Sequence, residues 1–374
     1  MIPGLKSIAT GNKVLHANWS DGTINAYPYI WLRDNDIADL HPTTRERMFD
    51  LTSVSIDIEP MKIELVNGAV EILWPERRQA SSYASDWLYR HRPGCKRDDP
   101  ADINQVLWTA ESLQEIPRFH AENCLTKPTL LREALSTAKS TGLVLFDGLA
   151  DDADAGVNFG DCIGFKRQTN FGVTFDVVSK PEPNNLAYTA AALPLHIDLT
   201  NQELVPGYQF LHCVQNSATG GESVFGDGYS ACAELQKTAP EHFACLKETP
   251  IPCRFHDDDF DIRQHRPVIS QDSSGEFTQL VFNAHIADIP DMPASVLQDF
   301  YAAYQALMRI ARGDKYRLQY VLQPGEMVMF DNRRVMHGRG EFDPTSGARH
   351  LRGYYIDRNE VDSRLRVLQR QIRK

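Results

Sequence analysis

The sequence predicts a mainly β protein with flanking helices, in which a small α+β N-terminal domain precedes a jelly-roll domain of the double-stranded β-helix type. The first observation behind this prediction is that much of the second domain reads as short apolar runs bounded by turn residues, a pattern typical of strands. The second is that helical spacing is confined to a few segments. Many short strands with few helices suit a jelly-roll barrel.

The N-terminal domain is predicted from a hairpin signal. Residues 63–74 alternate between apolar and polar side chains on both sides of Asn67-Gly68, a pair favoured in two-residue hairpin turns. The turn residues Pro93 and Gly94 and the charged run after them mark the end of the domain. We therefore expect the N-terminal domain over 1–95, a linker over 96–125 and the jelly-roll domain over 126–374.

The second domain opens with a predicted helix and a buried strand, and two further helices follow. Residues 143–147 form an apolar run between two glycines, which indicates the strand. The C-terminal helix is amphipathic and rich in arginine, so we expect it to dock on this or on another subunit. The helical positions are Leu130, Leu131, Ala134, Leu135 and Ala138; then, after Pro293, Leu297, Phe300, Tyr301, Tyr304 and Met308; and finally Val361, Leu365 and Leu368.

Composition excludes several classes of function. The 374 residues are 42% apolar and 24% charged, which is ordinary for a globular protein. The formal net charge of -11 argues against a nucleic-acid partner, which requires a concentrated basic surface. No stretch is long and apolar enough to suggest a membrane span or a secretion signal. Seven scattered cysteines without a Cys-x-x-Cys pair favour a reduced, cytoplasmic location.

Two distant motifs carry the chemistry: His196-Ile197-Asp198, and His337 downstream of a Pro-Gly turn. If His196 and Asp198 lie on one strand, their side chains point to the same face. A third ligand, from His337 just past a distant strand, would complete the two-histidine, one-carboxylate set that binds iron(II) and leaves positions open.

The alternative is that His-x-Asp occurs here by chance, as it does in many chains. His256-Asp257-Asp258 fits the same pattern, but its acidic surroundings show no alternation, and we interpret it as a solvated loop. Apolar residues surround His196 and Asp198, and a strand-like segment follows them, so a buried setting is expected there. By itself the motif is still more often structural than catalytic.

Arg349 changes the balance between these interpretations. It follows His337 at a distance that a turn and a strand can cover, and its guanidinium binds a carboxylate bidentately, as lysine cannot. An iron site that consumes a 2-oxoacid needs such a partner. Ser223, after the pair Gly220-Gly221, adds a hydroxyl at the entrance of a predicted strand.

A series of motifs in a fixed order makes the chain resemble the γ-butyrobetaine hydroxylase and trimethyllysine dioxygenase branch of the iron(II)/2-oxoglutarate-dependent oxygenases, which also includes 2-trimethylaminoethylphosphonate dioxygenase. The resemblance implies iron(II) on His196, Asp198 and His337, 2-oxoglutarate on Arg349 with help from Ser223, and oxygen as the second cosubstrate, with ascorbate stimulating turnover. The motifs are Trp31-Leu-Arg-Asp-Asn35, Asn185-Leu-Ala-Tyr-Thr189, Leu211-His-Cys-Val214, Gly220-Gly-Glu-Ser223, Phe330-Asp-Asn332, His337-Gly-Arg339, Arg349-His-Leu-Arg-Gly-Tyr-Tyr355 and Ser363-Arg-Leu-Arg-Val-Leu368.

The resemblance also implies an aromatic cage for a quaternary ammonium group, which is best held against π faces. The residues in the cage positions are Phe171, Phe175, Tyr188 and Tyr355. Two of them are Phe where this branch has Tyr and Trp. Ordinary core packing is the alternative for each of these rings.

The acidic end of the substrate is implied to bind Asn185 and Asn283. After Asn283 the chain has Ala284-His285, where the branch usually has another Asn and then an Arg, so His285 either assists a phosphonate or faces away. The expected substrate is therefore γ-butyrobetaine-like, with 2-trimethylaminoethylphosphonate or trimethyllysine as alternatives. A non-catalytic betaine sensor is the alternative of another class.

The N-terminal domain departs from the family in one respect. Relatives carry closely spaced cysteines and a later histidine that bind a structural zinc, whereas here Asp36, Asp39 and His41 stand in the first segment and Arg77 near the second. Because zinc needs soft or imidazole donors, we predict no structural zinc. Zinc that is stoichiometric and resists chelation would contradict this. The resemblance and the C-terminal helix favour a homodimer.

Overall fold

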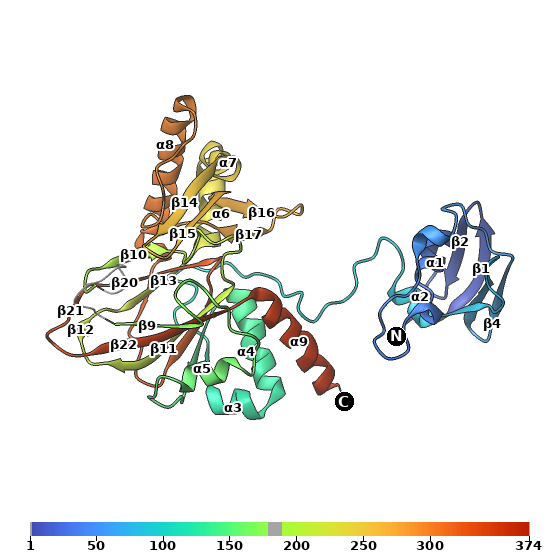
Figure 1. Ribbon diagram of the computed structural model, residues 1–374, viewed down its shortest axis with the longest axis horizontal. Coiled ribbons are helices and arrows are strands. Elements are labelled where there is room, and N and C mark those ends of the chain that lie inside the picture. Colours follow the sequence, from blue (N-terminus) through green and yellow to red (C-terminus); the bar gives the residue numbers. More distant parts are fainter. Residues whose placement is uncertain (1, 179–188, 374) are drawn as a thin grey trace. The chain divides into compact units, whose positions relative to one another are not determined.

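The computed structural model describes residues 2–178 and 189–373. The chain divides into two compact units, residues 1–99 and 100–374 (Figure 1). Each unit has a hydrophobic core of its own. The predicted linker, 96–125, includes strand β7 (Arg118–His120), and Trp108 and Ile116 from the same stretch are buried in a core of the second unit.

The N-terminal unit consists of two three-stranded antiparallel sheets with short helices. The predicted hairpin is confirmed: Asn67 and Gly68 have φ values of 48° and 79°, the left-handed conformation that this turn requires. Val70, Ile72 and Trp74, which follow the turn, are fully buried. The elements are β1 (Leu5–Gly11), β2 (Val14–Trp19), β3 (Ile24–Pro28), α1 (Tyr29–Asp34), η1 (Ile37–Asp39), η2 (Leu51–Ser53), β4 (Lys62–Val66), β5 (Ala69–Leu73), β6 (Ser81–Ala84) and α2 (Ser85–Arg90).

An ion-pair cluster joins two segments of this unit, one around Asp36 and the other around Arg77. Arg77 pairs with the buried Asp36 at 3.2 Å and also with Asp39. Arg33, whose side chain is 4% exposed, pairs with Asp39 and with Glu76, each at 2.5 Å. Charged side chains thus connect segments that are about forty residues apart. Because the charges are largely buried, removing one partner would leave the others uncompensated.

The second unit has two main sheets, consistent with the predicted jelly roll. Their strand orders are β10-β20-β13-β18 and β7-β8-β19-β11-β22-β9. The remaining elements are α3 (Ala121–Thr126), α4 (Pro128–Thr141), β8 (Leu143–Asp147), α5 (Ala155–Gly160), β9 (Thr174–Val177), β10 (Leu193–His196), β11 (Tyr208–Asn216), β12 (Thr219–Gly220), β13 (Ser223–Asp227), α6 (Gly228–Thr238), α7 (Pro240–Glu248), β14 (Pro250–His256), β15 (Asp261–Pro267), β16 (Ile269–Gln271), β17 (Phe277–Leu280), α8 (Ala294–Ala311), η4 (Asp314–Tyr316), β18 (Leu318–Tyr320), β19 (Met327–Asp331), β20 (Val335–Arg339), β21 (Phe342–Asp343), β22 (Arg349–Ile356) and α9 (Arg358–Ile372).

The inward faces of the two sheets enclose an apolar core that ends at a cavity. Phe225 of β13, Val335 of β20 and Leu351 of β22 belong to this core. Side chains alternate along a strand, so every second residue before or after these positions also faces inward. This periodicity directs polar residues of β13, β20 and β22 into the interior.

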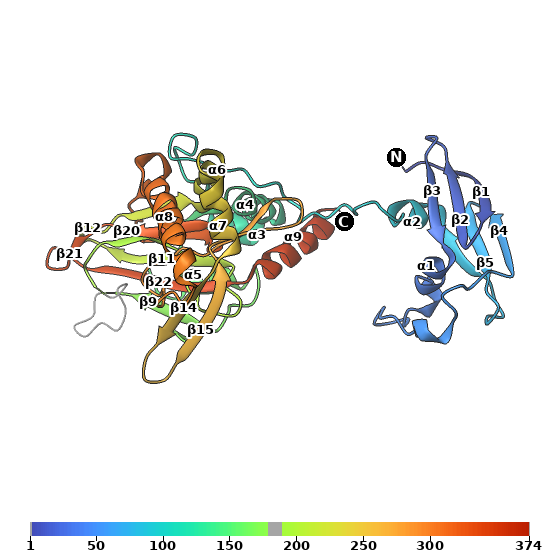
Figure 2. The ribbon, with the colours of Figure 1, turned by 90° about the horizontal axis from the view of Figure 1, so that it is seen from above.

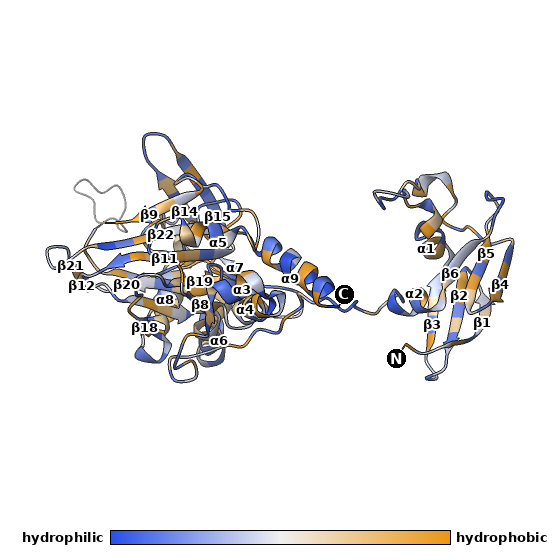
Figure 3. Ribbon diagram, turned by 90° about the horizontal axis from the view of Figure 1, so that it is seen from below, coloured by the Kyte–Doolittle hydropathy of each residue, from blue (hydrophilic) through white to orange (hydrophobic). Residues whose placement is uncertain are grey.

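Helices cover the outer faces (Figure 1; Figure 2 gives a second view). α3, α4 and α9 pack against the six-stranded sheet, whereas α6, α7 and α8 form a separate cluster that includes Met336 of β20. Val361, Leu365 and Leu368 of α9 are fully buried in the first group, so the C-terminal helix docks on its own subunit. Its alternating apolar and polar faces are visible in Figure 3.

The predicted helix after Pro293 is present, but its buried face differs from the predicted one. Pro293 is the N-cap residue of α8. Of the predicted apolar face Phe300 is buried and Leu297, Tyr304 and Met308 are partly buried, and the buried face continues through Ala303, Leu307 and Ala311. Tyr301 is instead 49% exposed, because it lies one residue, or about 100° of helical rotation, beyond Phe300. In the described part of the chain no helix is long and apolar enough to span a bilayer.

Candidate active site

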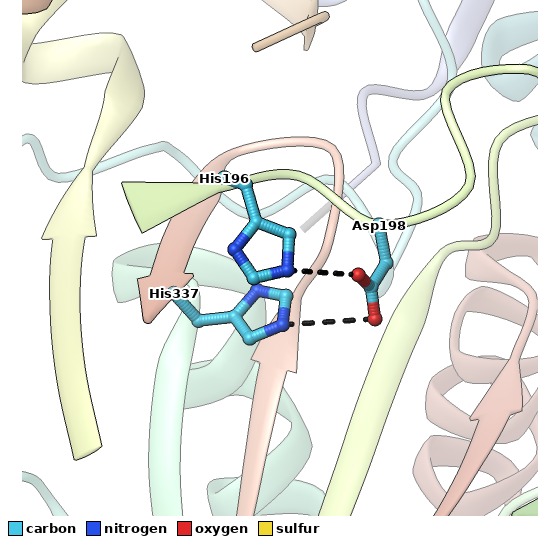
Figure 4. A group of neighbouring side chains, drawn as sticks. All are labelled: His196, Asp198 and His337. Carbon is cyan, nitrogen blue, oxygen red and sulfur yellow. Dashed lines mark ion pairs between the residues drawn. The ribbon is translucent and has the colours of Figure 1, made fainter. Parts of the chain in front are cut away.

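His196, Asp198 and His337 come together at the edge of the four-stranded sheet that β10 forms (Figure 4). One potential ligand atom from each lies within 4.8 Å of the others. His196 Nε2 is 3.0 Å from Asp198 Oδ1, and His337 Nε2 is 3.6 Å from Asp198 Oδ2. The two histidines are direct partners across the antiparallel pair β10 and β20, which brings their side chains to one place. Among the described residues this is the one such group of three metal-binding side chains.

The backbone around Asp198 differs from the expected continuous strand. β10 ends at His196, and Leu199 has a φ of 54°, so the chain turns away from the sheet at this point. His337, expected just past a strand, lies in the middle of β20. The side chains of His196 and Asp198 still point to the same place, because contacts other than sheet pairing fix the backbone of Ile197 and Asp198.

Two buried asparagines make these contacts. Asn332 Oδ1 accepts a hydrogen bond from Asp198 N at 2.9 Å, and Asn332 Nδ2 donates to Asp198 O at 3.0 Å. Asn283 Nδ2 donates to Ile197 O at 2.9 Å. Each amide thus takes the place of a neighbouring strand, and Asn332 satisfies both backbone polar groups of the ligand residue.

Side-chain contacts orient two of the ligands themselves. His196 Nδ1 is 3.0 Å from Pro194 O, and because a carbonyl oxygen can only accept a hydrogen bond, Nδ1 is the donor in this contact and Nε2 is the ring nitrogen that faces Asp198. Tyr355 donates its hydroxyl hydrogen to Asp198 Oδ2 at 2.8 Å. Such outer contacts are what fix the direction of metal ligands in general.

The electrostatics favour the forms of the ligands that bind metal. Burial alone would raise the pKa of Asp198, but the neighbouring His337 and hydrogen bonds from both histidines hold the pKa well below its usual value of 3.8. Burial, reinforced by the proximity of His196, lowers the pKa of His337 from 6.5. A carboxylate and a neutral imidazole are therefore favoured at neutral pH, and both can donate lone pairs to a cation.

Arg349 lies at the start of β22, inward-facing and 8% exposed. Its Nε atom is buried without a hydrogen-bond partner, and no carboxylate among the described residues pairs with its guanidinium. Burial and the charge of Arg339 lower the pKa of Arg349 to about 10. A buried guanidinium that lacks an anion fits the carboxylate of 2-oxoglutarate, and the adjacent triad of two nitrogens and one oxygen fits iron(II).

Ser223 also faces the cavity, at the start of β13. It is paired in register with Arg339 of β20. Within the described ranges no hydrogen bond joins its hydroxyl to Arg349. Gly221 lies against Arg349, since a Cβ placed there would be 3.2 Å from the arginine Cδ.

A cavity of about 380 Å³ extends from the metal-binding group. This volume lies in the range of roughly 300–1,000 Å³ that is usual for small-molecule sites. Phe171, Phe175 and Tyr355 line it, and the rings of Phe175 and Tyr355 are 5.3 Å apart. Tyr188 and Asn185, predicted for the same site, lie outside the described residues.

Asn283 and His285 both line this cavity. Asn283 Oδ1 accepts hydrogen bonds from His285 N at 2.9 Å and from Ile286 N at 3.3 Å, in addition to the contact of Nδ2 with Ile197. Much of its hydrogen-bonding capacity is thus used within the protein. The ring of His285 lies 5.5 Å from that of His196, edge to face, so it faces the site.

Three further cavity residues were not predicted from the sequence: Phe255, Asn201 and Gln209. Phe255 lies on β14, directly before the acidic run that we expected to be a loop, and its ring is 5.3 Å from that of Phe171. His256 ends the same strand and also lines the cavity, which corrects its interpretation as a loop residue. The alternation of Ile251, Cys253 and Phe255 was a usable signal, but the prolines in this segment obscured it.

Gln209 and Asn201 are polar residues at buried positions. Gln209 Oε1 and both side-chain polar atoms of Asn201 have no hydrogen-bond partner in the part of the chain that is described. Gln209 faces inward on β11, two residues before Leu211. A polar side chain at an inward position of an otherwise apolar strand was the signal that could have identified it.

Comparison with known proteins gives two family matches. Residues 113–355 match the family described as taurine catabolism dioxygenase TauD, TfdA family. Residues 7–89 match the family described as gamma-butyrobetaine hydroxylase-like, N-terminal. The two matches together span both compact units.

Individual relatives agree with these matches. A gamma-butyrobetaine dioxygenase from Pseudomonas sp. (strain AK-1) is 35% identical over 376 residues, covering 99% of this chain and 97% of the relative. A mitochondrial trimethyllysine dioxygenase from Rattus norvegicus is 26% identical, covering 92% and 83%. Among solved structures, an asparagine oxygenase with Fe(II), hydroxyasparagine and succinate has a TM-score of 0.51 at 19% identity, covering 63% of this chain and 82% of its own. That likeness supports the fold of the second unit.

Proposed function

Because the chain belongs to the taurine catabolism dioxygenase TauD, TfdA family and is an iron(II)/2-oxoglutarate-dependent dioxygenase, we propose that it hydroxylates an unactivated carbon of a small trimethylammonium-bearing acid, with γ-butyrobetaine as the first candidate. The observation that carries the proposal is that the metal-binding group and Arg349 line the same cavity as the rings of Phe171, Phe175, Phe255 and Tyr355, which we call the aromatic wall. A relative that is 35% identical over nearly its whole length is a gamma-butyrobetaine dioxygenase.

The residues divide the task as follows. His196, Asp198 and His337 would hold iron(II), and Arg349 would pair with the distal carboxylate of 2-oxoglutarate. Iron(II), 2-oxoglutarate and oxygen together supply the oxidising power needed to hydroxylate an unactivated carbon. The chain contributes binding, orientation and the exclusion of water. Ser223 would assist Arg349 from β13, across the cavity that both residues line.

The aromatic wall supports a cationic substrate. Phe171 and Phe255, and likewise Phe175 and Tyr355, form ring pairs 5.3 Å apart that line the cavity, where a quaternary ammonium can be held without hydrogen bonds. Tyr188 would add a fifth ring. With the cation held there, a short chain would extend from the wall toward the metal-binding group, which is the orientation that hydroxylation needs.

The acidic end is proposed to bind Asn185 and the remaining amide hydrogen of Asn283. Asn201 and Gln209 have unpaired polar atoms beside the same cavity and are further candidates. Neutral amides suit a singly charged carboxylate, which places γ-butyrobetaine ahead of the phosphonate. We further propose a homodimer, and this proposal rests on the family resemblance alone. The C-terminal helix no longer supports it, because the apolar face of α9 is buried within its own subunit.

The test is succinate release by the iron-loaded protein with 2-oxoglutarate, oxygen and ascorbate. The panel is γ-butyrobetaine, trimethyllysine, 2-trimethylaminoethylphosphonate and no added substrate. Stimulation by γ-butyrobetaine with a product one oxygen heavier supports the proposal. Stimulation by another member reassigns the substrate, and stimulation by none moves the substrate outside this group. Failure to bind iron(II) would instead favour the betaine sensor.

A further inference from the structure

Tyr355 belongs to two parts of the site at once. Its ring forms part of the aromatic wall, 5.3 Å from the ring of Phe175 and inclined at 31° to it. Its hydroxyl donates to Asp198 Oδ2 at 2.8 Å. The residue is 3% exposed, so water competes little for this hydrogen bond. A single side chain therefore connects the wall of the cavity to a metal ligand.

The position of Tyr355 on β22 limits how far either end can move. Its backbone is paired in register with Gln209 of β11, in the middle of the six-stranded sheet. With the backbone fixed, the ring can rotate only about its side-chain bonds, and rotation that improves one contact moves the other. The contact of the Tyr355 hydroxyl with Asp198 and the contact of its ring with Phe175 therefore change together.

Asp198 depends on its hydrogen bond from Tyr355, because sheet pairing does not hold it as it holds the two histidines. β10 has already ended at His196, and Asp198 is held by the amide of Asn332 on its backbone and by Tyr355 on its side chain. His337, by contrast, sits within a paired strand. A hydrogen bond from Tyr355 to Oδ2 restrains the rotation of the carboxylate and keeps Oδ1 directed toward His196.

We propose that Tyr355 is a positioning residue for the metal ligand Asp198 and that it couples binding of the substrate's cationic end to binding of the metal. The second part rests on the proposed function, because it requires a quaternary ammonium against the ring of Tyr355. A bound cation would hold the ring, and the held ring would keep the hydroxyl on Asp198. By linkage, a bound metal would in turn raise the affinity for the cation by the same factor.

The test compares Tyr355→Phe with Tyr354→Phe. Each variant loses one hydroxyl and keeps its ring, but Tyr354 faces the opposite side of β22 and donates to Gly156 O. Binding of Mn(II), a stand-in for iron(II) that resists oxidation, is measured by calorimetry on the metal-free proteins after both variants are shown to be folded. Outer contacts to metal ligands are typically worth about 10–100-fold in affinity, so Tyr355→Phe should raise the Kd for Mn(II) by about tenfold or more. Tyr354→Phe should leave it unchanged. Equal Mn(II) affinity in wild type and Tyr355→Phe would overturn the positioning role.

The coupling is measured by repeating the Mn(II) titration with saturating γ-butyrobetaine. We expect γ-butyrobetaine to tighten Mn(II) binding in wild type and in Tyr354→Phe, and this gain to disappear in Tyr355→Phe. A wild type that binds γ-butyrobetaine without any change in Mn(II) affinity would overturn the coupling. If wild type does not bind γ-butyrobetaine at all, the proposed substrate and the coupling both fail, while the first titration still decides the positioning role.

Discussion

Replacing Arg349 by Met should stabilise the protein while removing its affinity for 2-oxoglutarate. Burial and Arg339 lower the pKa of Arg349 from 12.5 to about 10, which corresponds to a cost of roughly 3 kcal/mol for holding this charge in the folded protein. Methionine keeps much of the side-chain length but carries no charge. Allowing for lost packing, we expect the free energy of unfolding to rise by about 1–3 kcal/mol in Arg349→Met without cosubstrate.

Two measurements check this prediction. Urea unfolding gives the stability, and calorimetry with 2-oxoglutarate on the Mn(II)-loaded protein gives the affinity, which should fall by at least about thirtyfold because the bound carboxylate loses its buried partner. The matched control is Arg352→Met, on the outer face of the same strand, where Arg352 pairs with Asp176 at 2.7 Å. That variant should lose some stability and keep its affinity for 2-oxoglutarate. Destabilisation by Arg349→Met, or unchanged cosubstrate affinity, would refute the reasoning.

Four further predictions follow from the site and the N-terminal unit. His337→Ala should abolish iron-dependent succinate formation in a folded protein; persistent turnover would exclude His337 as a ligand. Asn332→Ala leaves two backbone groups of Asp198 unpaired, so unfolding experiments should show a loss of about 2–4 kcal/mol and Mn(II) titration a weaker site, and an unchanged Kd would contradict this. Phe175→Leu should weaken γ-butyrobetaine binding but not 2-oxoglutarate binding, as measured by calorimetry; equal losses would indicate general damage. Arg77→Met should cost about 3 kcal/mol of stability in urea unfolding, and a neutral effect would show that the ion-pair cluster does not hold the unit together.

Local patterns in the sequence were sufficient where local physics decides the structure. The hairpin at Asn67-Gly68 requires two left-handed residues, and few other pairs adopt that conformation readily. The buried faces of α4 and α9 follow from helical spacing. The distance in sequence between His337 and Arg349 suited a turn and a strand, but His337 was expected just past a strand and instead lies within β20.

Features that depend on distant residues could not be predicted in this way. Asp198 was expected on a strand, but its position is set by Asn332, which lies 134 residues away in sequence. Phe255 enters the aromatic wall from a hairpin that no turn motif announced. The pairing of Arg77 with Asp36 and Asp39 likewise depends on how two separate segments fold together. In each case a contact with a residue that is distant in sequence decides the structure, and local sequence patterns do not reveal such a contact.

The most direct test of the central claim is the stoichiometry of one reaction with γ-butyrobetaine under heavy-isotope oxygen gas, followed by mass spectrometry. We expect one succinate for each hydroxylated γ-butyrobetaine, with the label in the product hydroxyl group and in succinate, and neither product in His337→Ala. Succinate formed without hydroxylated γ-butyrobetaine would contradict the substrate assignment. Hydroxylated product without 2-oxoglutarate consumption would contradict the dioxygenase chemistry itself.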